Sequence, residues 1–236
     1  MRTNASPMSI ADYLMNFAPA KPERIRRPMP FVTISREAGA GAHSLADALS
    51  ARFAREKDPL FSQWQVFDRG LCERVAEDAT MRTSLDGLLN DEFHSGFEDY
   101  LRQVLAGASS QSRVHHALFK TVREVCTLGK AIVIGRASAF VSRDLTLGVH
   151  VRLIASRKAR IERVRRETGL GALETGRALD LKDAQRARLV KTYFQKDVAD
   201  AHLYDAVWNS DYVSFDAMSA ALVALIRERT ARRTFG

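Results

Sequence analysis

A loop with two glycines, set between a predicted strand and a predicted helix, is the first feature that suggests chemistry. Phe31–Ile34 is a short run rich in β-branched residues, which predicts a buried strand. The loop 35–43 follows with Gly39 and Gly41, and apolar spacing predicts a helix over 44–56. The amide groups of such a loop converge on an anion, and the positive end of the helix dipole faces it. The pattern therefore predicts a phosphate-binding site.

The loop departs from a full P-loop, whose pattern is G-x-x-x-x-G-K-[ST]. The first glycine position holds Arg36 and the lysine position holds Ala42, while Gly39, Gly41 and Ser44 remain. Taken alone, the loop is equally compatible with a tight strand–helix connection that binds no ligand.

Arginines follow two further predicted strands. The strand 64–67 is followed by Asp68-Arg69, and the strand 131–134 by Gly135-Arg136. Of the 36 cationic residues 28 are arginine, whose planar guanidinium matches phosphate oxygens, and the net charge is +8. An arginine at one strand end is often merely solvated, but two beside a phosphate loop favour an anion site.

A third group of cations lies on a predicted helix over 156–167. Six cations occur within ten residues: Arg157, Lys158, Arg160, Arg163, Arg165 and Arg166. Spacings of three place three guanidinium groups near one helical face, where they repel each other unless an anion neutralises them. A solvated basic face, balanced in part by Glu162 and Glu167, is the alternative interpretation.

The surrounding elements predict an α/β fold. The chain of 236 residues is 46% apolar and 27% charged, which suits one domain with a sizeable core. Further strands are expected over 149–154 and 205–208, and further helices over 113–128, 183–197 and 214–229. Short apolar strands that alternate with helices indicate a parallel sheet covered on both faces, with ligands at the carboxyl ends of its strands.

Other classes of protein are disfavoured. No apolar run approaches the about 20 residues of a transmembrane helix, and the two cysteines form no disulfide or zinc pattern. A cytoplasmic protein is expected. Residues 1–30 are predicted to form a proline-interrupted basic arm or linker before a domain over 31–236; an amphipathic stretch at 10–17 suggests a homodimer contact.

Six motifs, in order, resemble the cytidylate kinase-like family, a bacterial branch of the nucleoside monophosphate kinases. They are V-T-I-S-R-E-x-G-x-G-x-H at 32–43, V-F-D-R at 66–69, I-V-I-G-R at 132–136, H-V-R-L-I-A-S with two later arginines at 150–163, D-A-Q-R at 183–186, and L-Y-D with Asn209. The resemblance extends over about 31–229, and that family likewise lacks the P-loop lysine.

The resemblance implies a three-layer P-loop NTPase-like domain with a five-stranded parallel sheet. A helical insertion at 80–128 would bind the acceptor monophosphate, and an arginine-rich lid at 156–186 would close over the transferring group. It also implies ATP and Mg²⁺ as cofactors and small nucleotides as ligands. Phosphoryl transfer of this kind depends on positioning and on neutralising charge.

The resemblance also assigns roles to residues of this sequence. The expected phosphate-binding residues are Gly39, Ala40, Gly41, Ala42, His43 and Ser44, with the Ser44 hydroxyl on Mg²⁺. The expected acceptor-binding residues are Asp68, Arg69, Gly135, Arg136 and Asp183. The expected catalytic cations are Arg36, Arg160, Arg163 and Arg186.

Two alternatives remain open at this point. Arg36 and Ala42 in the loop also fit a nucleotide-binding regulatory protein without turnover. The charge of +8 could serve nucleic acid, but the cations cluster at strand ends and no helix-turn-helix pattern is present, so this class is disfavoured, as is a membrane partner.

Overall fold

A computed structural model describes residues 28–68, 70 and 110–234. Its centre is a parallel sheet of five strands in the order β2-β3-β1-β4-β5. The strands are β1 (Phe31–Arg36), β2 (Gln65–Phe67), β3 (Ala131–Ile134), β4 (Gly148–Ile154) and β5 (Ala206–Asn209). The predicted α/β fold with a five-stranded parallel sheet is therefore confirmed.

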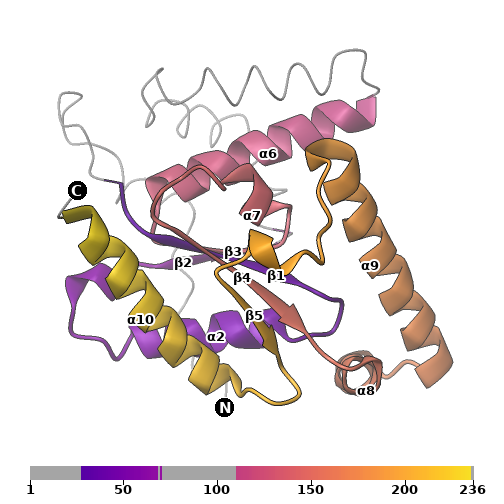
Figure 1. Ribbon diagram of the computed structural model, residues 1–236. Coiled ribbons are helices and arrows are strands. Elements are labelled where there is room, and N and C mark those ends of the chain that lie inside the picture. The colour runs from indigo at the N-terminus through magenta and orange to yellow at the C-terminus, as the bar shows by residue number, and fades with distance from the viewer. Residues whose placement is uncertain (1–27, 69, 71–109, 235–236) are drawn as a thin grey trace.

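Helices cover both faces of this sheet (Figure 1). They are α2 (Ala42–Phe53), α6 (Ser110–Leu128), α7 (Ser138–Val141), α8 (Arg157–Thr168), α9 (Ala172–Phe194) and α10 (Phe215–Thr234), with short 3-10 turns η1 (Pro59–Phe61) and η3 (Ala201–Leu203). One core cluster joins α2 and α10 to the sheet, and a second joins α6 to the opposite face. These two clusters make the three layers of the domain.

The register of the central strands brings their carboxyl ends together. Ile34 of β1 pairs with Ile134 of β3 on one side and with Val151 of β4 on the other. Side chains of the three strands alternate between the two cores, since successive residues of a strand point to opposite faces. Arg36, Gly135 and the segment before α8 consequently emerge at the same edge of the sheet.

Two helices begin earlier than their sequence pattern predicts. The helix after the glycine loop begins at Ala42 instead of 44, and α9 begins at Ala172 instead of 183. The first half of α9 buries Leu179 while Leu173 and Leu181 are exposed, so no continuous apolar stripe marks its start, and the helix packs against α8. Gly169 ends α8 in a left-handed conformation.

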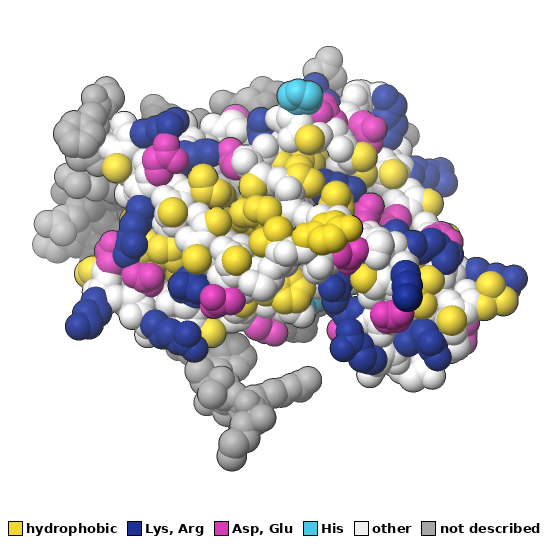
Figure 2. Space-filling model, turned by 60° about the horizontal axis from the view of Figure 1, so that its bottom comes forward, with side chains coloured by type: hydrophobic (Ala, Val, Ile, Leu, Met, Phe, Trp, Pro, Cys, Tyr) yellow, Lys and Arg dark blue, Asp and Glu magenta, His cyan; other side chains and the backbone are white. Residues whose placement is uncertain are grey.

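Arginines near the C-terminus connect α10 to the rest of the fold. Arg227 pairs with Glu56 at 2.7 Å, and Arg229 donates to the Gly148 carbonyl and to Asp205, both at 2.6 Å. On the face shown in Figure 2, Lys and Arg side chains stand in separate groups with Asp and Glu among them. Part of the arginine excess therefore stabilises the fold itself. Within the described ranges, no helix is both long and apolar enough to span a membrane.

The role of Arg229 in the fold can be tested by a matched pair of substitutions on α10. Arg229→Met removes two hydrogen bonds to β4 and to Asp205, and we expect a loss of about 1–2 kcal/mol in the free energy of unfolding. Arg232 is exposed, and its described bond is to Glu228 of its own helix. Arg232→Met should therefore change the free energy of unfolding by less than about 0.5 kcal/mol. Urea denaturation of both variants checks this, and equal effects would contradict it.

Candidate functional site

The loop after β1 turns on two glycines in the left-handed region. Gly39 has a φ of +78° and Gly41, which directly precedes α2, has a φ of +91°. A Cβ atom on Gly39 would lie 2.9 Å from the Arg160 carbonyl oxygen, and one on Gly41 would lie 2.3 Å from the Phe215 ring. Glycine at both positions therefore permits the backbone conformation and lets α8 and α10 pack directly on the loop.

The first turn of α2 presents amide groups without acceptors. Gly41 offers no side-chain cap, and the first helical bond runs from the Leu45 N–H to the Gly41 carbonyl. In the described part of the chain, the N–H groups of Ala42, His43 and Ser44 have no hydrogen-bond acceptor. These three donors and the helix dipole together favour an anion at this end of α2.

The predicted phosphate-binding residues differ in their exposure. Ala40 and Ala42 are buried, His43 is exposed and Ser44 is half-buried. Counting from Gly41, the hydroxyl position of a P-loop falls on His43, so Ser44 lies one residue further into the helix than the P-loop pattern places its hydroxyl. Among the described residues no group of three His, Cys, Asp or Glu could hold a metal ion. The Ser44 assignment to Mg²⁺ stays a prediction.

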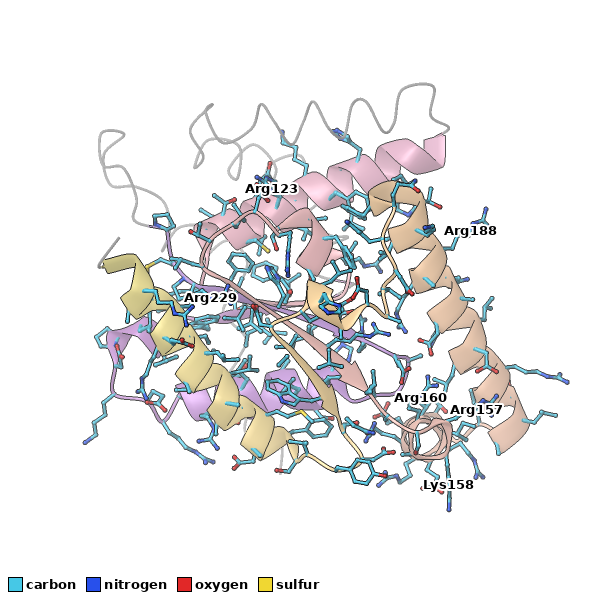
Figure 3. All side chains as sticks on the ribbon, in the orientation of Figure 1. Arg123, Arg157, Lys158, Arg160, Arg188 and Arg229 are labelled. Carbon is cyan, nitrogen blue, oxygen red and sulfur yellow. The ribbon has the colours of Figure 1, made fainter. Side chains whose placement is uncertain are left out.

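Two arginines of α8 bind carbonyl groups of the loop (Figure 3 labels the first). Arg160 donates to the Ala38 carbonyl at 3.2 Å, and Arg163 donates to the Gly39 carbonyl. These contacts hold the loop carbonyls toward α8, while the amide groups of α2 stay without partners. The sequence predicted both arginines as clamps on a transferring group, and the structure brings them to the loop, where they hold its backbone.

The carboxylate of Asp183 joins the loop, α8 and α9. One of its oxygens accepts from the Ala38 N–H at 2.7 Å and from Arg186 at 2.9 Å, and the other accepts from Arg160 at 2.6 Å. Asp183 was predicted to bind an acceptor, and here both of its oxygens serve protein donors. It is the carboxylate nearest to a group of arginines that it cannot neutralise alone.

Arg36 is a cation of this group with a markedly lowered pKa. Its guanidinium lies over Gly135, where an added Cβ atom would come within 1.6 Å of Nη1. Burial, together with the charges of Arg186 and Arg136, lowers the pKa of Arg36 to about 9, although Asp183 opposes the shift. Because arginine stays protonated in proteins, the shift means that this site disfavours the cation. An anion bound there would relieve that cost.

Arg186 experiences the same surplus of positive charge. Burial lowers the pKa of Arg186, and Arg152 and Arg160 lower it further, while Asp183 raises it. Arg36, Arg136, Arg152, Arg160 and Arg186 thus form one electrostatic group, which we call the arginine cluster.

The turn after β3 is strained in a way that positions Arg136. Gly135, Arg136 and Ala137 have φ angles of +74°, +56° and +54°, so three consecutive residues are left-handed. For residues other than glycine this conformation costs about 1–2 kcal/mol each. Such strain is concentrated at functional sites. Burial lowers the pKa of His115 in α6, and the charge of Arg136 lowers it further.

Other predicted positions lie at the same edge or outside the described residues. Asp68 follows β2, which pairs with β3, and is half-buried. Arg69 lies outside the described residues, as do 80–109 of the expected insertion and 1–27 of the expected arm.

Sequence reasoning missed two residues of the site. Glu37 accepts from the Ala155 N–H at 3.1 Å and lies 3.6 Å from Arg160 Nε. Arg152 is buried in the middle of β4 and contributes to the cluster. A charged residue inside the apolar run 149–154 was the available signal for Arg152, because a central strand rarely buries a cation without a reason.

Comparisons with known proteins agree with this fold. A model of the cytidylate kinase-like family matches residues 31–212. The crystal structure of an uncharacterized protein from Eubacterium ventriosum has a TM-score of 0.66 and 15% identity, and the match covers 85% of this chain and 99% of that one. No curated protein matches the chain.

Two shikimate kinases show weaker likeness. The enzyme from Bacteroides thetaiotaomicron has a TM-score of 0.45 and 13% identity, covering 84% of this chain and 99% of that one. The enzyme from Acinetobacter baumannii, in complex with shikimate, has a TM-score of 0.44 and 11% identity, covering 85% and 94%. Both scores are below 0.5, so these likenesses support no conclusion about this chain.

The contact between Arg36 and Gly135 predicts the effect of a single methyl group. Gly135→Ala displaces the Arg36 guanidinium, and we expect the affinity for inorganic pyrophosphate to fall at least about tenfold. Gly171 has no atom within 4 Å of an added Cβ and a φ of −64°, so Gly171→Ala should leave the affinity unchanged. Calorimetric titration measures both. An unchanged affinity in Gly135→Ala would place Arg36 outside the anion site.

The position of Asp183 predicts a stronger response to anions when its charge is removed. Asp183→Asn leaves the cluster without its nearest carboxylate, so the variant should melt earlier than the wild type. Inorganic phosphate should then raise its melting temperature more than that of the wild type, because a bound anion replaces the missing charge. Thermal denaturation with and without phosphate checks this. An equal rise in both proteins would contradict it.

Proposed function

Since the chain belongs to the cytidylate kinase-like family, we propose that it transfers a phosphoryl group from ATP to a nucleoside monophosphate, with a cytidylate-like acceptor. One observation carries this proposal. Among the described residues, Arg36, Arg152, Arg160 and Arg186 of the arginine cluster carry more positive charge than Asp183 and Glu37 balance, and they stand next to amide groups of α2 that have no described acceptor.

The charge count favours a ligand with several negative charges. Arg36, Arg152, Arg160 and Arg186 bring four positive charges to the cluster, while the described carboxylates beside these four are Asp183 and, at 3.6 Å from Arg160, Glu37. One carboxylate or sulfate would leave much of that charge unbalanced. A phosphoryl group in transfer between two nucleotides brings several negative charges into one small volume.

The site has two ends that suit two nucleotides. The N-terminus of α2 and the glycine loop suit the phosphates of ATP. Arg36 and Arg136, at the ends of β1 and β3 with Asp68 nearby, suit the phosphate of the acceptor. Arg186 interacts electrostatically with Arg36 at the acceptor end and with Arg160 at the loop. It is therefore suited to a position between the two phosphates.

Magnesium would assist this transfer by neutralising phosphate charge. Mg²⁺ in kinases is held largely by phosphate oxygens and water, with one or two protein ligands. The half-buried Ser44 hydroxyl in the first turn of α2 and the Glu37 carboxylate at the loop are the described groups that fit this small requirement.

A second candidate is a nucleotide-binding protein without turnover. The lysine position holds Ala42, the first residue of α2, which is 5% exposed and packs in the core between α2 and the sheet. In addition, Arg160 and Arg163 already donate to loop carbonyls. This candidate predicts nucleotide binding with no transfer to any acceptor.

Incubation of the full chain with Mg-ATP and a panel of nucleoside monophosphates tests the proposal. We expect ADP formation that depends on the acceptor and is fastest with cytidylate. Arg186→Met should lower kcat/KM about 100-fold, because it removes a cation between the two phosphates. Arg188→Met on the same helix should not change kcat/KM, since Arg188 is exposed and points away from the sheet (Figure 3).

The outcomes separate the two candidates. ATP binding without ADP formation for any acceptor would support the regulatory protein. An equal loss of kcat/KM in Arg186→Met and Arg188→Met would contradict the role given to the arginine cluster.

A further inference from the structure

A buried arginine occupies the middle of the sheet, where cations are rarely found. Arg152 belongs to β4, which lies between β1 and β5, and it stands opposite Ser35 in the register. Only 6% of Arg152 is exposed. Removing a guanidinium from water is costly unless a partner carries the opposite charge.

The contacts of Arg152 do not neutralise it. Its Nη1 donates to the Ser35 hydroxyl at 3.2 Å, and its guanidinium carbon lies 5.9 Å from the centre of the Tyr204 ring. The Tyr204 hydroxyl lies 3.1 Å from the Ser35 oxygen and donates to the Val198 carbonyl at 2.9 Å. Among the described residues no carboxylate lies within 4.0 Å of the Arg152 guanidinium. Two hydroxyl groups and a ring orient the cation without balancing its charge.

The side chain of Arg152 reaches the functional edge of the sheet. Its strand neighbours Val151 and Leu153 pack in the core of α2 and α10, so Arg152 faces the opposite side. Ser35, its hydrogen-bond partner, directly precedes Arg36 and the glycine loop. The charge of Arg152 is also one cause of the lowered pKa of Arg186.

Other cations near the loop are engaged or directed elsewhere. Arg160 and Arg163 donate to carbonyl groups of the loop, and Arg36 lies over Gly135 on the side of β3. The lysine that normally neutralises the β- and γ-phosphates is replaced by the buried Ala42. Arg152, which has no anionic partner among the described residues and is oriented toward the end of β1, can supply the cation that such a site lacks.

We propose that Arg152 supplies the charge that the loop lysine supplies in an ordinary P-loop, and that Ser35 and Tyr204 position its guanidinium for a phosphate at the end of β1. The assignment to a transferring phosphate rests on the proposed kinase function. Binding of a multiply charged phosphate at Arg152 does not depend on turnover. Ser35 and Tyr204 are positioning residues in this account, and Arg152 contacts the ligand.

Arg152→Met separates this role from a structural one, because the two predict opposite changes. If Arg152 binds an anionic ligand, its charge is unbalanced in the ligand-free protein. Removing that charge should then raise the melting temperature of the ligand-free protein by about 3 °C. The affinity for inorganic pyrophosphate, measured by calorimetry, should fall at least about tenfold. Arg152→Lys should retain part of that affinity, since it keeps the charge and loses the planar fork.

Tyr204→Phe tests the positioning without removing the cation. The substitution keeps the ring beside Arg152 and removes the hydroxyl that lies 3.1 Å from the Ser35 oxygen. The affinity for pyrophosphate should therefore fall about threefold. If the wild type forms ADP, the same variant should lower kcat more than it raises KM, because a misplaced cation matters most when charge develops.

The results distinguish this inference from the kinase proposal. Loss of pyrophosphate binding in Arg152→Met without turnover in any variant supports the role of Arg152 and overturns the kinase. Turnover by the wild type and an equal rate in Arg152→Met overturns the role of Arg152 alone. A lower melting temperature or failure to fold in Arg152→Met, with unchanged pyrophosphate affinity in Tyr204→Phe, assigns Arg152 to the fold and contradicts the proposal.

Discussion

The Asp183 carboxylate is the contact on which the rest of the site depends. It accepts from the backbone of the glycine loop and from Arg160 of α8 and Arg186 of α9. Three segments distant in the sequence are thereby held at the carboxyl end of β1. Asp183 and Glu37 are the two described carboxylates beside Arg36, Arg152, Arg160 and Arg186, so these four guanidinium groups keep a net positive charge. The same contact therefore organises the loop and leaves the site in need of an anion.

The arginines of this chain divide into two kinds by their partners. One kind stabilises the fold by pairing with a carboxylate on another element, as in Arg123 with Asp144, Arg157 with Asp180, and Arg229 with Asp205. The other kind has too few acids nearby, as at Arg36 and Arg152. Net charge alone does not separate them, because both kinds add equally to the +8. In the proposed function, the second kind binds phosphate.

The sequence was sufficient for the parts of the fold that local patterns determine. Short apolar runs located all five strands, and the glycines of the loop matched the two left-handed positions at Gly39 and Gly41. Contacts between segments that are distant in the sequence could not be predicted from local patterns. That Arg160 and Arg163 bind the loop carbonyls, and that Arg152 faces the site, depends on how α8 and β4 pack. The start of α9 was missed as well, because no continuous apolar stripe marks it.

The central claim is that this site recognises charge on phosphate, and the base is secondary. A calorimetric comparison of ATP with adenosine, on the full chain in the same buffer, tests it most directly. The account predicts measurable binding of ATP and none of adenosine, with an ATP affinity that weakens as salt is added, because screening reduces the attraction between charges. Binding of adenosine as tight as that of ATP, or an ATP affinity that salt does not change, would contradict it.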